Sequence, residues 1–403
     1  MNITDQTAIR QCTSCQLCAT VCVHKAISIS LDDRGFYRPV VDESFCNDCG
    51  NCTRVCYKFD NQIETTLDDG LGKKTLYSAW SDDSRLLAET TSGGIGDLLA
   101  HELLKEGYRV VGVVYNNDAD RAEHSIAKSE EELIGFRGSK YIQSYTFEAF
   151  LEVVKRCRNE KFAVFGTPCQ IYALNKLANQ KKVRENFLFV DLYCHGCPSI
   201  HIWTKYSNHI KEKTGFGKFD QVIFRSKLKG WGTFYVVVVV DGKVIFKSKP
   251  GDNGFYDLFF SDQVLNEGCH DCLLRGSLEY TDIRLGDFWG KKYLDNSRGV
   301  SAVSIATDKG AELFEKIKSH IVWEECNYDD FLKYQSWGRV YKPNDSLRNH
   351  LFDCLSNPME DIKDIVKYYH IHQSKKEKIK RYIKNILHYM PLSFYRFSKR
   401  IFI

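Results

Sequence analysis

The sequence predicts a chain of three parts: an α+β N-terminal domain, a larger α/β domain with a mixed sheet, and a helical C-terminal tail. Three observations support this prediction. Eight of the 16 cysteines crowd into two short runs near the start, predicted strands and helices alternate through the middle, and basic residues gather at the end. At 403 residues the chain is also too long for one ordinary domain. We place the three parts at residues 1–65, 75–345 and 346–403.

The first part is defined by two cysteine runs that share the spacing C-x2-C-x2-C-x3-C. The runs are Cys12, Cys15, Cys18, Cys22 and Cys46, Cys49, Cys52, Cys56. This is the bacterial ferredoxin spacing, in which three cysteines of a run hold one [4Fe–4S] cluster and the fourth holds the other. One cluster is therefore expected on Cys12, Cys15, Cys18 and Cys56, and the second on Cys46, Cys49, Cys52 and Cys22. Zinc is the alternative, but it would leave the third and fourth cysteines of each run unexplained.

The residues between the two runs fit the same interpretation. The stretch "AISISLDDRGFYRPVVDES" predicts a strand, a turn at Gly35 and a second strand. This connection is the one that a small ferredoxin-like α+β domain requires. Residues 1–11 are polar and no apolar run approaches about 18 residues, so no signal peptide or membrane span is expected. We therefore expect a cytoplasmic protein, in which clustered thiols bind metal more often than they form disulfides.

The second part begins near Thr75 with a helix that a glycine pair opens. In "TTSGGIGDLLAHELLKEGYRVVGVVY", Ser92, Gly93 and Gly94 precede a helix with one apolar face, and residues 109–115 form a β-branched strand. A glycine pair at a helix N-terminus exposes backbone N–H groups to an anion such as a phosphate. The alternative is a plain loop-to-helix turn.

Two further strand-to-helix turns carry cysteines. "KFAVFGTPCQIYALNKLAN" places Cys169 after a strand, and "NFLFVDLYCHGCPSIHIW" places Cys194 and Cys197 after the next. Both turns lie at carboxyl ends of strands, where α/β sheets bind their ligands. A β-hairpin is predicted about Asp241-Gly242. After it, Cys269 and Cys272 form another C-x2-C pair.

These turn cysteines together predict a third metal site. Cys169, Cys194, Cys269 and Cys272 are the expected ligands of a third [4Fe–4S] cluster, with zinc as the alternative. Cys197 either replaces Cys194 as a ligand or is a bystander. The remaining cysteines, Cys157, Cys326 and Cys354, are expected to be structural thiols.

Several motifs then fall in the order of one family. "TSGGIGDLLAHELL", "GSKYIQS", "FGTPCQIYAL", "VDLYCHGCPS", "GWGTF", "CHDCLLRG" and "DIRLGDFWG" resemble the coenzyme F420 hydrogenase/dehydrogenase β-subunit family over residues 75–345. The resemblance implies a flavoprotein, with FAD or FMN, and a [4Fe–4S] cluster on Cys169, Cys194, Cys269 and Cys272. It also implies flavin or substrate contacts from Ser92, Gly93, Gly94, Gly138, Ser139, Lys140 and Tyr141.

The combined interpretation is an iron–sulfur flavoprotein oxidoreductase. Electrons would pass from ferredoxin or another low-potential donor through the clusters to the flavin, and then to an organic substrate. Use of F420 stays open, and a small-molecule or lipid-linked sugar is an equal alternative, because relatives with this layout often accompany surface polysaccharide synthesis. A second hypothesis is an electron-relay β subunit of a larger F420- or ferredoxin-linked hydrogenase or dehydrogenase. His195, Tyr141 and Asp287 are candidate proton donors, and no catalytic residue is assigned.

The tail carries a separate signal. Residues 374–403 hold nine Lys or Arg residues against one acid, Glu377, and apolar residues recur at helical spacing from Ile379 to Met390 until Pro391 ends the helix. A basic amphipathic helix suits an anionic membrane surface, so residues 375–403 predict peripheral contact with the inner face of the membrane. The alternative is a helix docked on the body. Nucleic acid is not expected as a partner, because the rest of the chain is mildly acidic.

Overall fold

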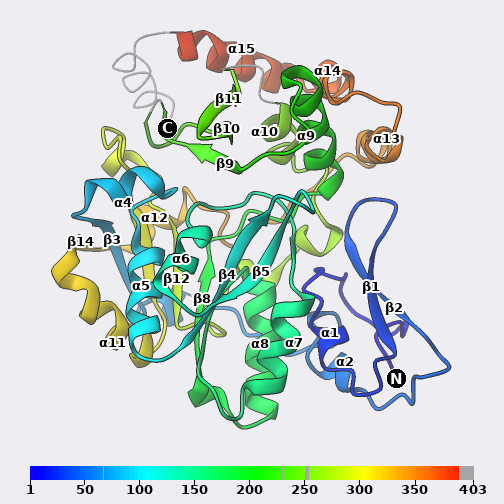
Figure 1. Cartoon of the computed structure of the whole chain (residues 1–403), viewed down its shortest axis with the longest axis vertical. Coiled ribbons are helices and arrows are strands. Elements are labelled where there is room, and N and C mark those ends of the chain that lie inside the picture. The colour runs from blue at the N-terminus through cyan, green and yellow to red at the C-terminus, as the bar shows by residue number, and fades with distance from the viewer. Residues whose placement is uncertain (67, 229, 250–253, 390–403) are drawn as a thin grey trace.

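A computed structural model describes residues 1–66, 68–228, 230–249 and 254–389. Figure 1 shows a small N-terminal domain beside a large mixed sheet, with a third layer of helices and short strands above them. The predicted helix of the tail is present as α15, Lys375–Tyr389, while the expected helix end at Pro391 and the rest of the tail lie outside the described residues. No helix of the described chain has both the length and the apolar character that crossing a membrane requires.

The N-terminal domain confirms the predicted strand, turn and strand. Its two strands pair antiparallel, and Gly35 lies in the turn with a φ of 77°. A short helix contains the third cysteine of each run, Cys18 in α1 and Cys52 in α2. The elements are α1 Leu17–Thr20, β1 Ile27–Leu31, β2 Tyr37–Val41 and α2 Asn51–Arg54.

The large sheet has nine strands in the order β14-β3-β13-β12-β8-β7-β4-β5-β6. Its centre, β12-β8-β7-β4, is parallel, whereas β13, β3, β14 and β5 each run antiparallel to a neighbour. The mixed sheet is therefore confirmed. The strand bounds are β3 Thr75–Ser81, β4 Arg109–Asn116, β5 Arg121–Ala127, β6 Ser144–Tyr145, β7 Phe162–Phe165, β8 Phe187–Leu192, β12 Ile283–Asp287, β13 Ser301–Ile305 and β14 Ile321–Cys326.

Helices cover both faces of this sheet because successive strand residues point to opposite sides. On β4, Val110 packs in the core under α5 and α11, and Val111 packs in the core under α7 and α8. Gly94, with a φ of 80°, starts α5, as the glycine pair predicted. The helix bounds are α3 Asp68–Leu71, α4 Ser84–Glu89, α5 Ile95–Lys105, α6 Glu130–Leu133, α7 Phe147–Arg156, α8 Pro168–Gln180, α11 Asp308–Ile317 and α12 Tyr328–Leu332.

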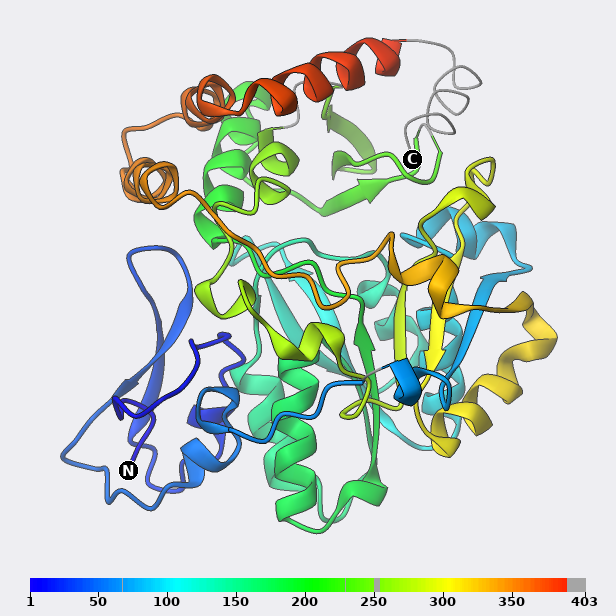
Figure 2. The ribbon, with the colours of Figure 1, turned by 180° about the vertical axis from the view of Figure 1, so that it is seen from behind.

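The third layer was not predicted as a unit. The expected hairpin about Asp241-Gly242 is present, but it belongs to a three-stranded sheet, β11-β10-β9, that shares a core with α9, α10, α13 and α14 (Figure 2). Leu351 and Phe352, which the sequence placed in the tail, are buried in this unit together with Trp203. The elements are α9 Ile200–Thr214, β9 Gln221–Ser226, β10 Tyr235–Val240, β11 Lys243–Lys247, α10 Gly254–Phe259, α13 Asp345–Ser356 and α14 Ile362–His372.

Candidate iron–sulfur centres and flavin site

The two N-terminal cysteine runs adopt the same local backbone. Ser14 and Gln16 have φ values of 63° and 64°, and Asp48 and Gly50, at the same places in the second run, have values of 55° and 74°. Left-handed residues turn the chain so sharply that the cysteines between them can face a common centre. The repeated spacing therefore corresponds to a repeated structure.

The structure brings the expected crossing cysteine to the first run. Burial raises the pKa of the Cys18 thiol, and the nearby thiols of Cys15 and Cys56 raise it further. Burial likewise raises the pKa of Cys56 to about 12, with Cys12 adding to the rise. Thiols that repel one another in a buried site are stabilised as thiolates when metal binds them, so this set fits a cluster. We call Cys12, Cys15, Cys18 and Cys56 the inner set.

The other four cysteines lie nearer the surface. Cys22 packs in the same small apolar cluster as Cys52, and Cys49 is exposed. Two N–H groups already approach sulfurs of this set: the Ala26 backbone N–H donates to Cys22 Sγ at 3.3 Å, and the Asn2 amide to Cys46 Sγ at 3.5 Å. We call Cys22, Cys46, Cys49 and Cys52 the outer set.

Five thiols, not four, gather at the third site. Cys169 lies in the first turn of α8, Cys194 follows β8, Cys269 ends a short helical turn at Glu267–Cys269, and Cys272 follows it. Burial raises the pKa of Cys169 to about 12 and that of Cys194 to about 11, and the Cys272 thiol contributes to both shifts. The four predicted ligands therefore converge from three separate segments.

Cys197 is the fifth thiol, and the structure places it among these ligands. Burial raises its pKa, with Cys169 and Cys194 adding to the shift. Its backbone N–H donates to Cys269 Sγ at 3.3 Å. The backbone position of Cys197 thus supports a predicted ligand, whether or not its own sulfur binds metal. We call Cys169, Cys194, Cys197, Cys269 and Cys272 the third set.

The inner set adjoins the third set. Burial raises the pKa of Cys15, and Cys56 and Cys169 are the two nearby thiols that contribute most to the rise. The Asn266 amide donates to Ser14 Oγ at 2.9 Å, and a Cβ at Gly268 would lie 3.0 Å from the carbonyl oxygen of Cys12. A side chain at this position would push the two cysteine loops apart by a few tenths of an ångström. Two parts of the chain some 250 residues apart therefore meet at their cysteines.

Buried ionic groups fix the loop that carries Cys272. Arg284 and Asp191, both about 2% exposed, pair through Arg284 Nη2 and Asp191 Oδ2 at 2.5 Å. The same guanidinium donates to the carbonyl oxygens of Leu274 and Arg275 at 3.3 and 3.4 Å. A buried ion pair that also bonds backbone carbonyls holds a loop in one position, because breaking it leaves an uncompensated charge. Sequence reasoning did not find this pair, although "VDLYC" and "DIRLGD" both place a charge inside a strand.

His195, a candidate proton donor, is held from both sides. Its Nε2 lies 3.0 Å from Asp262 Oδ1, and its Nδ1 lies 3.0 Å from the Tyr341 hydroxyl. The contact with Tyr341 is a hydrogen bond, whereas Nε2 and Asp262 Oδ1 lie at ion-pair distance and neither atom has a hydrogen-bond partner among the described residues. This arrangement favours a supporting role beside Cys194 over direct proton transfer.

The two segments predicted to contact flavin also meet. The Ser139 backbone N–H donates to Thr91 Oγ1 at 2.8 Å, which joins the turn at Ser92, Gly93 and Gly94 to the loop of Gly138. Two contacts differ from expectation. The Gly93 N–H is used by Ser301 Oγ at 2.9 Å, and the Lys140 ammonium group bonds the carbonyl oxygens of Gly135 and Arg137.

Two cations near these segments were missed by the sequence analysis. Lys227 donates to the Ser92 carbonyl at 2.7 Å, and burial lowers the pKa of Lys227 to about 8. Arg225 donates to the Tyr141 hydroxyl at 3.2 Å and to Asp287 Oδ2 at 2.5 Å. In the sequence these two cations are marked only by the letters "FRSK" at the end of β9.

One buried atom in this group suits a cofactor. Arg225 Nη2 has no hydrogen-bond partner among the residues that the structure describes, and the side chain is 1% exposed. Buried donors are rarely left unpaired, so this nitrogen fits an acceptor oxygen of a bound group. The Trp231 and Trp289 rings stack beside it at 5.0 Å, and the guanidinium lies 4.9 Å from the Trp289 ring. These residues fit a planar, oxygen-bearing cofactor such as a flavin.

Comparisons with known proteins agree with the family motifs. The family description "Coenzyme F420 hydrogenase/dehydrogenase, beta subunit N-term" matches residues 76–151, and its "C terminus" counterpart matches residues 159–330. The chain belongs to the coenzyme F420 hydrogenase/dehydrogenase β-subunit family. A "4Fe-4S dicluster domain" matches residues 11–58, in addition to the family regions.

Two relatives with curated names are similar to this chain. The chain is 25% identical over 269 residues to the coenzyme F420 hydrogenase subunit beta of Methanococcus voltae, covering 64% of this chain and 85% of the relative. It is 24% identical over 258 residues to the subunit of the same name from Methanosarcina barkeri, covering 62% and 80%. A solved F420-reducing [NiFe] hydrogenase complex from Methanosarcina barkeri contains a similar chain, with 19% identity, a TM-score of 0.44 and coverage of 77% and 94%.

Proposed function

We propose that this chain is an iron–sulfur flavoprotein that carries electrons between a low-potential carrier such as ferredoxin and an organic substrate. One observation carries the proposal: the inner set adjoins the third set, because Cys15 and Cys169 pack against the same apolar core and the Asn266 amide donates to Ser14 Oγ at 2.9 Å. The outer set reaches the surface at Cys49, and its Cys22 belongs to the same cysteine run as Cys12, Cys15 and Cys18 of the inner set. We infer that the three sets work in series, with electrons entering at the outer set and reaching the third set through the inner set.

The residues around the sulfurs have defined tasks. When bound, [4Fe–4S] clusters would supply one-electron transfer and a flavin would couple it to two-electron chemistry. The backbone N–H groups of Cys197, Ala26 and Ser14 donate to cysteine sulfurs at 3.3, 3.3 and 3.4 Å. Such bonds stabilise negative charge on sulfur and so raise the reduction potential.

The flavin would be held by the turn at Ser92, Gly93 and Gly94 and by the loop from Gly138 to Tyr141. Lys227 and Arg225 would complete the site. Arg225 would donate to an acceptor oxygen through its unpaired Nη2, and Asp287 would keep the guanidinium in place. Lys227 already bonds the Ser92 carbonyl and so fixes the turn. We expect about one flavin per purified chain. Replacement of Arg225 by Gln should remove most of it, whereas the exposed-surface variant Lys128→Gln should retain it.

A second candidate is a relay β subunit within a larger F420-linked complex. The curated relatives carry the name of such a subunit, which favours this candidate. The two candidates differ in what purifies with the chain. A stoichiometric hydrogenase or dehydrogenase partner would support the subunit, and substrate reduction by the isolated chain would support the self-contained enzyme.

Metal analysis after anaerobic purification tests the claim that both candidates share, which is the presence of three [4Fe–4S] clusters. Three [4Fe–4S] clusters require about 12 irons with equal sulfide. The variants Cys12→Ala, Cys46→Ala and Cys169→Ala should each lose about four irons, and Cys354→Ala, a lone thiol on α13, should lose none. Zinc in place of iron, or no loss in Cys169→Ala, would contradict the proposal.

A further inference from the structure

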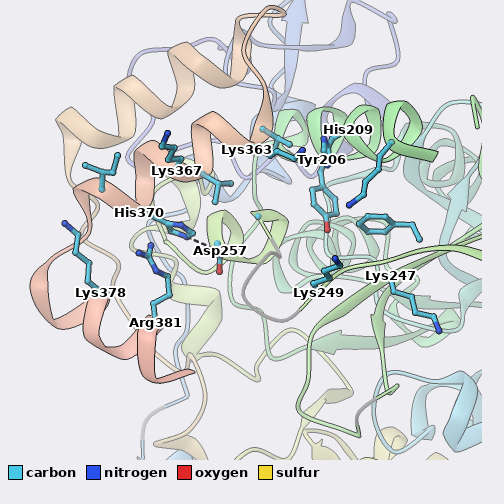
Figure 3. Close-up of a pocket in the computed structure, with 16 residues that line it drawn as sticks. Tyr206, His209, Lys247, Lys249, Asp257, Lys363, Lys367, His370, Lys378 and Arg381 are labelled. Atoms are coloured by element: carbon cyan, nitrogen blue, oxygen red, sulfur yellow. Dashed lines mark hydrogen bonds and ion pairs between the residues drawn. The ribbon is translucent and has the colours of Figure 1, made fainter. Parts of the chain in front are cut away.

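A large pocket lies in the third layer, away from every cysteine set. It has a volume of about 560 Å³ and is lined by α9, α10, α14, α15 and the strand segment around Lys247 (Figure 3). Helix α9 begins just after Cys197, and Lys213 in its last turn lines the pocket. A helix of 15 residues spans about 20 Å, so the pocket is a site distinct from the third set.

The lining of this pocket is strongly basic. Seven cationic side chains face it: Lys213, Lys247, Lys249, Lys363, Lys367, Lys378 and Arg381. Among the described residues none of the seven forms an ion pair with a carboxylate. Figure 3 shows labelled cations on both sides of the pocket, with Arg381 extending from α15 toward His370 and Asp257. Cations that repel one another around one hollow favour a bound polyanion.

The one carboxylate that lines the pocket in the described part of the chain does not neutralise this charge. Asp257 Oδ2 lies 3.1 Å from His370 Nε2, so its nearest partner is the imidazole. Glu212 and Asp361 come within 4.8 Å of His209 but do not line the pocket. The excess positive charge is therefore available to a ligand.

The pocket is also partly apolar, and α15, which contributes Lys378 and Arg381 to its lining, carries a separate apolar stripe. Phe246, Ile362 and Val366 line the cavity. Along α15 the side chains of Ile379, Tyr382, Ile383 and Ile386 are all exposed, and their spacing puts them on one helical face. A helix with cations on one side and exposed aliphatic groups on another suits an amphiphile with an anionic head.

We propose that this pocket binds the phosphate groups of an anionic amphiphile, whose apolar part lies along the stripe of α15. The phosphates would be held by lysines from α14, α15 and β11, which act as point charges. The source of the phosphate is either a membrane lipid headgroup or a soluble phosphate ester that carries an apolar group. This site is independent of the electron transfer proposed above.

The test uses the full-length holoprotein and two double variants. Lys363→Gln/Lys367→Gln removes two exposed charges from the pocket on α14. Lys128→Gln/Lys182→Gln removes two exposed charges outside the pocket lining, and so matches the change in net charge. Glutamine preserves helix propensity, so both variants should fold. Binding is measured by sedimentation with phosphatidylglycerol/phosphatidylcholine vesicles and by calorimetry with inorganic pyrophosphate.

The proposal expects the pocket variant to bind at least about tenfold more weakly and the control variant to bind as the parent does. Vesicle binding with competition by pyrophosphate would identify a lipid source. Pyrophosphate binding without vesicle binding would identify a soluble phosphate ester. Equal losses in both double variants, or no binding of either probe by the parent, would overturn the proposal. Iron and flavin contents, measured on the same samples, report separately on the redox proposal.

Discussion

The contact between the inner and third sets depends on Asn266, and its replacement by Ala is the sharpest structural test. Asn266 is fully buried, its amide donates to Ser14 Oγ at 2.9 Å, and its Oδ1 accepts the Gly268 N–H at 3.0 Å. Removal leaves both partners buried without that bond. An unsatisfied buried group costs about 1–3 kcal/mol, and Ser14 Oγ keeps the Arg38 guanidinium at 3.5 Å, so its cost lies at the low end of that range and the closed arrangement of the two loops should lose about 2–4 kcal/mol.

Hydrogen exchange of the anaerobic holoprotein measures this loss. A cost of 2–4 kcal/mol should speed local opening by about 30- to 1,000-fold, seen as faster exchange in peptides covering residues 9–20 and 264–276. The control Asn344→Ala removes the N-cap bond to Leu347 on α13 and should change exchange there only. The double variant with Ser14→Ala should show a coupling of about 0.5–1.5 kcal/mol. Unchanged exchange in both cysteine loops, or an equal rise throughout the chain, would refute the reasoning.

Three further predictions concern single residues. Cys194→Ala should lose about four irons, because Cys194 is an expected ligand. Cys197→Ser should keep its iron and shift the reduction potential of the third site. Iron loss in the Cys197 variant alone would mean that Cys197, and not Cys194, is the ligand. Phe45 is 64% exposed and lies beside the outer set, so it should contact the electron carrier. Phe45→Glu should raise the KM for the carrier at least about fivefold without lowering the unfolding temperature. An unchanged KM would exclude this surface as the docking site of the carrier. The hydrogen bond to Asp97 raises the pKa of His101, so His101 contributes stability below its unfolded pKa and that contribution is lost as the pH rises through its folded pKa. His101→Gln should therefore destabilise the protein more at pH 5.5 than at pH 8 in urea unfolding, and equal losses at the two pH values would contradict the shift.

Much of the architecture was predictable because it is encoded locally. The cysteine spacing, the turn at Gly35 and the strand-to-helix turns at Cys169 and Cys194 each depend on a few neighbouring residues, and all are present. The third layer was not predicted, because the apolar face of a helix indicates burial without naming its partner. Helix α13 looked like part of a tail, yet Leu351 packs with α9, α10 and the three-stranded sheet.

The candidate site likewise combines features that local sequence predicts with features that only the folded chain creates. Spacing predicted the eight N-terminal cysteines and four turn cysteines, and the structure groups them into adjoining sets. Spacing could not choose between Cys194 and Cys197, which lie three residues apart in one turn. The bond from Asn266 to Ser14 joins residues 252 positions apart, so no local pattern reveals it. Arg225 was missed because a charged residue inside a strand carries no motif.

The central claim is that the outer and inner sets carry electrons between the surface and the third set. Stopped-flow reduction of the holoprotein by reduced ferredoxin tests it most directly, with the variant Cys49→Ala and the control Cys354→Ala. The account predicts that the Cys49 variant reduces its inner centres at least about 100-fold more slowly, which corresponds to a barrier about 2.7 kcal/mol higher, while the control matches the parent. Equal rates in all three proteins would show that electrons enter the third set by another route and would contradict the account.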